Sequence, residues 1–222
     1  MEETAIDILG IHLQEPVTVL TNILIVLTCA ILYFKLNLPT SKPELKKHWR
    51  SFFVFFGTSA LIGAFAHGFK SYFAEETFYY IWMLMNLSGI PITYFLHCAN
   101  IELSDFTDKT KQILHYIFIA VILVFTIITI ITNNFASVKI NGGIAILFTI
   151  IAHVITWRKK MEGSGWIAFG FIFSISTMII HTAKLSLGVW FNFKDISHVF
   201  MNIALFMIYA GVLRKLRAFP VK

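Results

Sequence analysis

The sequence has few charged residues and few cysteines, and both shortages restrict what the protein can be. Only 14% of its 222 residues are Asp, Glu, Lys or Arg, whereas about a quarter of a typical soluble domain is charged. With a mean hydropathy of +0.75, the chain is too apolar for an ordinary soluble domain. The two cysteines, Cys29 and Cys98, both lie in apolar segments, so no disulfide framework is expected.

Long segments without a charged residue make up most of the chain. Each reaches about the 17–25 residues that an α-helix needs to cross a bilayer. We predict an all-α, polytopic membrane protein: a seven-transmembrane helix bundle in a single domain that covers residues 1–222. The expected spans are residues 16–36, 50–69, 78–99, 113–132, 139–157, 166–184 and 195–213. Pro91 is expected to kink the third span.

Lys and Arg are distributed unequally between the two predicted sides of the membrane. Fourteen lie on the side that includes the C-terminus, and four lie on the other side. The positive-inside rule therefore places the N-terminus outside and the C-terminus in the cytoplasm. This topology explains the net charge of +6, so we expect membrane lipids as partners and no nucleic acid. A bacterial inner membrane or a eukaryotic endomembrane or plasma membrane is the expected location.

Three histidines are expected at similar depth, near the outer ends of their helices. His67 falls late in the second span, His181 late in the sixth, and His198 one turn inside the seventh. An imidazole in hydrocarbon is costly, so an ionisable residue there indicates a functional site. Three neutral imidazoles with an open fourth position suit a catalytic zinc ion that activates water. His67, His181 and His198 are therefore the candidate zinc ligands.

Other interpretations of these histidines stay open. Each could be satisfied separately by a neighbouring hydroxyl or lie at the level of the lipid headgroups, and two could bind haem. They could also be hydrogen-bonding or proton-linked groups in a non-enzymatic binding or transport protein. Candidate residues for lining its polar pocket are Asn22, Asn86, Ser174, Thr177 and Asn202. Retinal binding is not indicated, because the seventh predicted span contains no lysine.

No Asp or Glu lies inside a predicted span, and Glu75, Glu76 and Asp195 lie at the outer rim. Asp195 precedes His198 by three residues, so it is expected to cap the seventh helix and could also orient an imidazole. Asp195 and Ser59 are the candidate catalytic residues. A direct nucleophile pair of Ser59 with the second-span histidine is not expected, because eight helical residues separate the two by about 12 Å.

This constellation resembles the CREST superfamily, which includes alkaline ceramidases and the progestin and adiponectin receptor family. The resemblance rests on seven spans, an outside N-terminus, His67 in GAFAHGF and His198 in HVFMN. The family pattern has a second histidine where Asn202 stands here, and a serine where Gly63 stands. At the position of the family's helix-3 aspartate the chain offers only Asn86.

The resemblance implies a membrane-embedded, zinc-dependent hydrolase of a lipid amide or ester, with its site in the outer leaflet. Because the seventh span lacks the family's second histidine, His181 is the expected third zinc ligand. The alternative is a non-enzymatic seven-helix protein that binds or transports a lipid or another small molecule through a polar, histidine-containing pocket. Stoichiometric zinc would distinguish the first function from the second.

Overall fold

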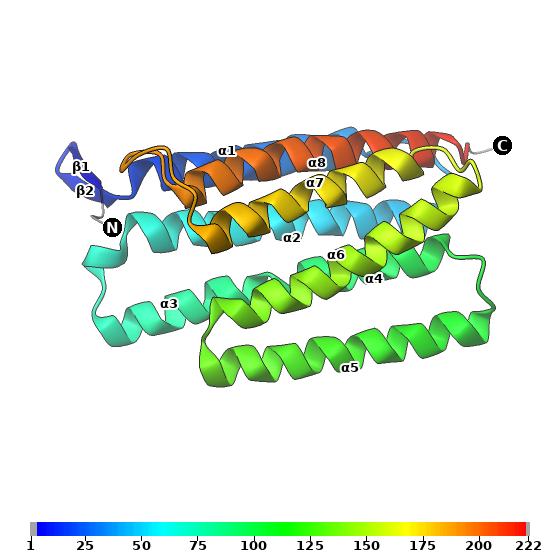
Figure 1. The fold of residues 1–222 in the computed structure, drawn as a ribbon, viewed down its shortest axis with the longest axis horizontal. Coiled ribbons are helices and arrows are strands. Elements are labelled where there is room, and N and C mark those ends of the chain that lie inside the picture. Colours follow the sequence, from blue (N-terminus) through cyan, green and yellow to red (C-terminus); the bar gives the residue numbers. More distant parts are fainter. Residues whose placement is uncertain (1–3, 221–222) are drawn as a thin grey trace.

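The computed structural model describes residues 4–220, so Lys222 of the basic side lies outside the described chain (Figure 1). A short antiparallel hairpin of β1 (Ala5–Ile8) and β2 (Ile11–Gln14) comes first. The helices that follow are α1 (Pro16–Lys35), α2 (Pro43–Gly68), α3 (Glu75–Ser88), α4 (Ile90–Leu103), α5 (Asp108–Thr132), α6 (Phe135–Arg158), α7 (Ser164–Ala183) and α8 (Phe193–Arg217).

Within the described residues, seven helical segments are long and apolar enough to cross a membrane. The pair α3 and α4 counts as one of them, residues 75–103. The predicted all-α class and the seven apolar helices are confirmed, and they are compatible with a multi-pass integral membrane protein. The N-terminal hairpin is an addition that the hydropathy pattern did not indicate.

The third span is divided at Gly89. α3 ends at Ser88, α4 begins at Ile90, and Pro91 stands in the first turn of α4. Proline lacks the N–H that a helix interior needs, but it suits a first turn, where that N–H would have no partner within the helix. The predicted kink is therefore observed as a break just before the proline.

Two helices are longer than the charge-free segments that predicted them, because each extends into neighbouring basic residues. α2 begins at Pro43 rather than at residue 50, and α8 continues to Arg217 rather than ending at residue 213. The longer α8 brings Lys215 into the helix, and its side chain is only 1% exposed. A lysine of the last helix is thus buried, two residues beyond the end of the predicted span.

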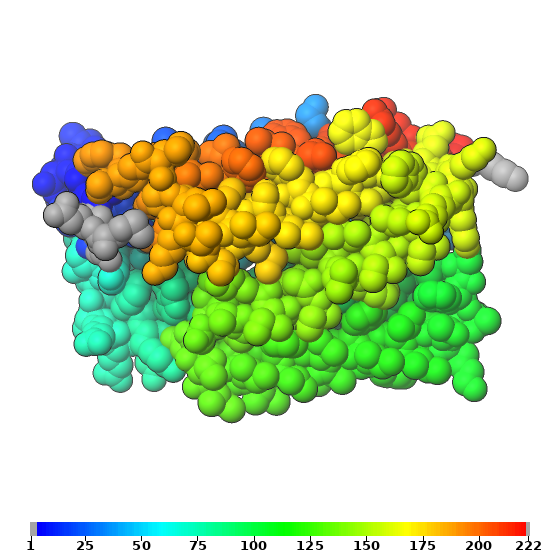
Figure 2. All heavy atoms as spheres, viewed as in Figure 1, coloured from blue at the N-terminus to red at the C-terminus, as the bar shows by residue number. Residues whose placement is uncertain are grey.

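Six helices form a closed ring in which α1, α2, α4, α6, α7 and α8 contact one another in that order, and α8 contacts α1. α5 lies outside the ring against α3, α4 and α6 (Figure 1). Side chains of α5, α6 and α7 form much of the face seen in Figure 2. α5 exposes a row of large apolar residues, Ile117, Leu123, Val124, Ile127 and Ile131.

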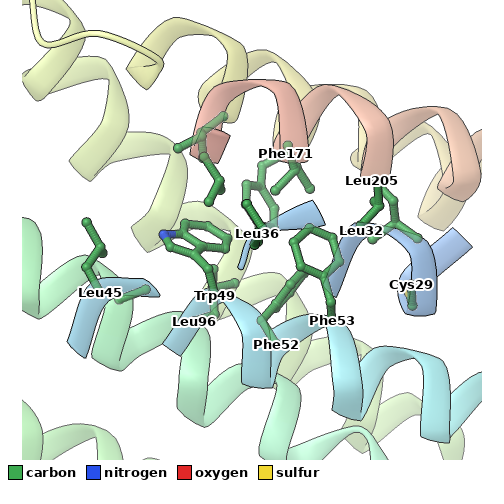
Figure 3. Packing of buried hydrophobic residues seen from close by; sticks show 14 of the residues in the cluster. Cys29, Leu32, Leu36, Leu45, Trp49, Phe52, Phe53, Leu96, Phe171 and Leu205 are labelled. Atoms are coloured by element: carbon green, nitrogen blue, oxygen red, sulfur yellow. The ribbon is translucent and has the colours of Figure 1, made fainter. Parts of the chain in front are cut away.

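The N-terminal hairpin and the C-terminus lie at opposite ends of the bundle (Figure 1). We call these the hairpin end and the C-terminal end. Buried aromatic side chains fill the C-terminal half, where Trp49, Phe52 and Phe53 of α2 pack with Leu36 and Phe171 (Figure 3). This dense core separates the C-terminal end from the polar residues at the hairpin end.

Candidate functional site

A cavity of about 580 Å³ lies between the helices towards the hairpin end. All three candidate zinc ligands, His67, His181 and His198, line it. A neighbouring cavity of about 470 Å³ shares His67, Trp82 and Lys194 with it. Both volumes lie in the range of roughly 300–1,000 Å³ that is usual for small-molecule sites.

His67, late in α2, contacts Glu15 at the cavity wall. Its Nδ1 lies 2.6 Å from Glu15 Oε2, and the side chains are only 16% and 11% exposed. Lys194 of α8 donates to the other oxygen of the same carboxylate. The edge of the Trp82 ring meets the imidazole, with the ring centres 6.0 Å apart. Glu15, directly before α1, thus joins α1, α2 and α8.

Glu15 is strongly acidic in this environment. Burial raises the pKa of its carboxyl, but the contacts with His67 and then Lys194 outweigh burial and lower the pKa from 4.5 to about 2. The carboxylate is therefore charged at every physiological pH, and its charge neutralises much of the positive charge at the cavity mouth.

His198, in the second turn of α8, is oriented by α1. Its Nδ1 lies 2.9 Å from Thr21 Oγ1, and the Thr21 hydroxyl donates to the Thr18 carbonyl at 3.1 Å. Because a hydroxyl has a single proton, Thr21 must accept from the Nδ1–H of His198. The contact between His67 Nδ1 and Glu15 also requires the proton on Nδ1. Both contacts use Nδ1, so the Nε2 atoms of His67 and His198 are left for a ligand.

His181, late in α7, packs against aromatic rings. Its ring centre lies 4.9 Å from that of Phe193, in an edge-on contact, and 5.6 Å from that of Phe135. The rest of the cavity wall is mainly apolar and comes from all six helices of the ring, with Ile25, Phe56, Ile92, Ile146, Met178 and Met201 among its residues. The cavity therefore combines a polar wall at the hairpin end with an apolar interior.

The histidines line one cavity without forming a ligand set for a metal. Between residues 4 and 220, no group of three or more His, Cys, Asp or Glu side chains is placed to hold a metal ion. The residues as arranged do not fit a three-histidine zinc site. Zinc binding by His67, His181 and His198 therefore stays a prediction.

The other candidate residues fall into two groups. Asn22, Ser59 and Thr177 line the cavity with the histidines. The Ser59 hydroxyl lies 2.9 Å from that of Ser88, so it is paired with a hydroxyl. The remaining three candidates, Asn86, Ser174 and Asn202, are buried between helices and are absent from the described lining of the cavity.

Hydrogen bonds explain why these three residues are directed elsewhere. Asn86 donates to the Asn133 side chain at 3.1 Å. Ser174 donates to the carbonyl one turn earlier in α7 at 2.7 Å. Asn202 donates to the His198 carbonyl one turn earlier in α8 at 3.1 Å.

Asp195 takes part in the cap of α8, but as the third helical residue of a capping box in which Asn192 is the N-cap. Its Oδ2 accepts from the backbone N–H of Asn192 at 2.8 Å and completes a capping box. Its Oδ1 accepts from Thr18 Oγ1 at 2.6 Å, and the side chain is fully buried. Both carboxylate oxygens are thus occupied by α1 and the helix start, so Asp195 positions α8 against α1 instead of contacting an imidazole.

Glu15 and Lys194 are site residues that were not predicted from the sequence. Glu15 was overlooked because it precedes the first apolar segment, and Lys194 because it precedes the last. The available signal was their position, since each lies directly next to a predicted span. Charged residues at the boundaries of two spans can pair when the helix ends meet at one level.

A protein-family profile matches residues 17–217, and its description is "Family of unknown function (DUF6962)". No curated protein and no solved structure matches the chain. Nothing in these comparisons connects the chain with the CREST superfamily, so that resemblance stays a prediction.

Proposed function

The chain belongs to DUF6962, a family of unknown function, and we propose that it binds a small amphipathic molecule, such as a lipid, in the cavity at the hairpin end. One observation carries this proposal: a cavity of about 580 Å³ has three histidines on its wall and mainly apolar residues elsewhere. Apolar pockets with a few placed polar groups are typical of small-molecule sites.

The polar wall indicates which head group would suit the cavity. His67 and His198 each have Nε2 left for a hydrogen bond with a ligand, and Lys139 and Lys194 add positive charge to the lining. A head group that has both a hydroxyl or amide donor and an acceptor oxygen matches this set. An acyl or sterol-like body would then contact Ile25, Phe56 and other apolar residues deeper in the cavity.

The proposed orientation puts the cavity in the outer leaflet, with the N-terminus outside and the C-terminus in the cytoplasm. The excess of Lys and Arg at the C-terminal end supports it. The membrane would be a bacterial inner membrane or a eukaryotic endomembrane or plasma membrane. In this orientation a lipid can reach the cavity from the leaflet in which it resides.

Thermal unfolding of the detergent-purified protein with a panel of ceramides, lysophospholipids and fatty-acid amides tests the proposal. At least one class should raise the unfolding temperature of the wild type and of His115→Gln, whose imidazole lies on α5 away from the cavity. His198→Gln should lose this response. No stabilisation by any member of the panel, or an unchanged response of His198→Gln, would contradict the proposal.

A zinc-dependent hydrolase of a lipid amide or ester is the second candidate, and one observation favours it. Histidine ligands of zinc usually donate their other ring N–H to a carboxylate or another acceptor. His67 contacts Glu15 and His198 contacts Thr21 in this way. The residues as placed do not form the ligand set, so metal content decides between the two candidates.

Metal analysis of protein purified without chelators, with His181→Ala alongside, is the direct test. A hydrolase of this kind should contain about one zinc per chain, as a single catalytic site requires. Its His181→Ala variant should contain far less, and the wild type should cleave a fluorescent ceramide or acyl ester. Wild-type protein that lacks zinc and stays inactive after zinc is added would exclude this candidate.

A further inference from the structure

A second polar region lies between α4 and α6, apart from the histidines of the cavity. Buried polar side chains recur there three or four residues apart on α4 and four or eight residues apart on α6, and each is at most 6% exposed. We call this set the α4–α6 seam, and it consists of Thr93, His97, Asn100, Asn141, Thr149 and His153.

Two hydrogen bonds cross the seam. Asn141 Nδ2 donates to Thr93 Oγ1 at 3.1 Å, and Asn100 Nδ2 donates to Thr149 Oγ1 at 2.8 Å. Such bonds between polar side chains commonly join helices in membranes. They account for the amide nitrogens and the hydroxyls, but they leave the amide oxygens of Asn100 and Asn141 unpaired.

The seam contains more buried polar atoms than its cross-helix bonds satisfy. The Oδ1 atoms of Asn100 and Asn141, and both ring nitrogens of His97 and His153, have no hydrogen-bond partner among the described atoms. Buried polar groups are nearly always bonded to protein or to ordered water. Helix packing alone does not explain the two imidazoles, because it needs only the Asn–Thr pairs. A file of ordered water would satisfy all of these atoms.

The seam extends from the cavity towards the C-terminal end. Asn141 adjoins Gly142, and Thr93 adjoins Ile92; both neighbours line the cavity. From Asn141 to His153, twelve residues of α6 cover about 18 Å. This is more than half of the roughly 30 Å hydrocarbon core of a bilayer. A hydrated seam would therefore bridge much of the membrane.

Where the seam comes nearest to the C-terminal end, it meets a group of buried hydrogen-bond donors. His153 faces Lys215 of α8, whose Nζ donates to Ser164 Oγ at 2.6 Å. Thr156 Oγ1 donates to the same Ser164 oxygen at 2.8 Å. The Trp49 ring of α2 lies 6.3 Å from the His153 ring, and its Nε1 also has no partner among the described atoms. This donor-rich end would orient the oxygen atoms of entering water.

The groups that face the two imidazoles favour protons over metal cations. The His97 ring stacks on the Phe118 ring of α5, with the ring centres 3.7 Å apart, and its centre lies 5.7 Å from that of the Phe148 ring of α6. His153 faces Trp49 and the ammonium group of Lys215. Within the described chain, neither histidine has an ion pair with a carboxylate. Beside the two imidazoles a sodium ion would meet ring nitrogens and a positive charge, although the amide oxygens of Asn100 and Asn141 lie elsewhere in the seam. Imidazole readily binds and releases protons near neutral pH.

We propose that the α4–α6 seam is a proton path between the cavity and the C-terminal end. Each imidazole accepts a proton from water at one ring nitrogen and releases the proton from its other ring nitrogen to the next water molecule. The ring is neutral before and after the transfer, and a turn of the ring restores its first tautomer. Asn100, Asn141 and Thr149 hold the intervening water. This activity requires no ligand in the cavity, so it is separate from the proposed ligand binding.

Proton uptake into proteoliposomes tests the path. The purified full-length chain is reconstituted into vesicles that contain pyranine, and a potassium gradient with valinomycin drives proton entry. Wild-type vesicles should acidify about tenfold faster than protein-free vesicles. His153→Gln and Thr149→Val should lower the protein-dependent rate about tenfold, which corresponds to about 1.4 kcal/mol in the barrier.

Thr126→Val on α5 is the matched control, because its hydroxyl donates to Ile122 of the same helix and lies outside the seam. It should conduct protons at the wild-type rate. His97→Gln replaces any seam variant that does not elute as a monodisperse species. Wild-type vesicles that acidify no faster than empty ones, or correctly folded seam variants that keep the wild-type rate, would overturn the proposal. Sodium uptake without acidification would also overturn it.

Discussion

Glu15 joins three helices at the hairpin end although it lies outside every apolar segment. It contacts His67 at the end of α2 and Lys194 at the start of α8, and it is only 11% exposed. Glu15→Gln leaves the Lys194 ammonium without an opposite charge, so we expect a loss of about 2 kcal/mol in the free energy of unfolding. Thermal unfolding at pH 7 measures it, with the exposed Glu76→Gln as the control.

The same carboxylate should make stability depend on acidity. Its pKa is about 2 in the folded protein, below the ordinary value of 4.5. The stabilisation is therefore complete above about pH 4.5 and is lost as the pH falls from there towards 2. The difference in unfolding temperature between wild type and Glu15→Gln should shrink as the pH is lowered from 6 to 3. A constant difference over this range would contradict the pairing.

Thr18 of α1 has an equally specific role, because it bonds to the buried Asp195 carboxylate at 2.6 Å. Thr18→Val keeps the shape of the side chain but leaves one oxygen of a buried charge unpaired. We expect a loss of about 1–3 kcal/mol in the free energy of unfolding. Thr58→Val is the matched control, since Thr58 is exposed and bonds within its own helix. Equal effects of the two variants in chemical or thermal unfolding would argue against the contact.

The start of α7 packs tightly against α8 where Gly163, the residue before α7, meets Gly211. A Cβ on Gly211 would lie 2.6 Å from the carbonyl oxygen of Gly163 and 2.7 Å from the backbone nitrogen of Ile167. Gly211→Ala must therefore separate the two helices, and we expect it to lower the free energy of unfolding by at least about 2 kcal/mol. Thermal unfolding measures this loss. Gly142→Ala in α6 meets no atom within 4 Å and should be neutral or slightly stabilising.

The apolar helices could be predicted because each contains a long segment without charged residues, which is easy to recognise in a sequence. A segment without charge is typical of a helix that crosses a membrane, but the helix itself can continue into charged residues, as α2 does from Pro43. The hairpin was not predicted, because strands of four residues on either side of Leu9 and Gly10 carry little periodic signal. The break before Pro91 was anticipated as a kink because proline restricts helices by a local steric rule.

For the candidate site, the sequence predicted how far along its helix each residue lies, but not which neighbouring helix its side chain faces. Counting residues from the span boundaries placed His67, His181 and His198 near one end, and all three line the cavity. The spacing of residues along a helix does not show which other helix each of its faces packs against. Asn86 therefore faces Asn133 instead of the cavity. Glu15 was missed because it precedes the first apolar segment and its partners, His67 and Lys194, are distant in sequence.

At the scale of the whole molecule, the two ends of the bundle differ in what they contain. The C-terminal half is filled by Trp49, Phe52 and their neighbours, while the cavity lies towards the hairpin end. The ring of helices therefore encloses a cavity towards the hairpin end, and the dense core closes that cavity on its C-terminal side. The α4–α6 seam passes beside this core, so a proton could cross the bundle by a route that the proposed ligand cannot follow.

The orientation of the whole molecule can be tested with single cysteines at its two ends. Leu187, in the loop between α7 and α8 at the hairpin end, is 81% exposed, and Phe106, in the loop between α4 and α5, is 50% exposed. The native Cys29 and Cys98 are buried, so they give little background. Because basic residues gather at the C-terminal end, Leu187→Cys should react with an impermeant maleimide on intact cells. Phe106→Cys should react only after permeabilisation, and the reverse pattern would mean that the cavity faces the cytoplasm.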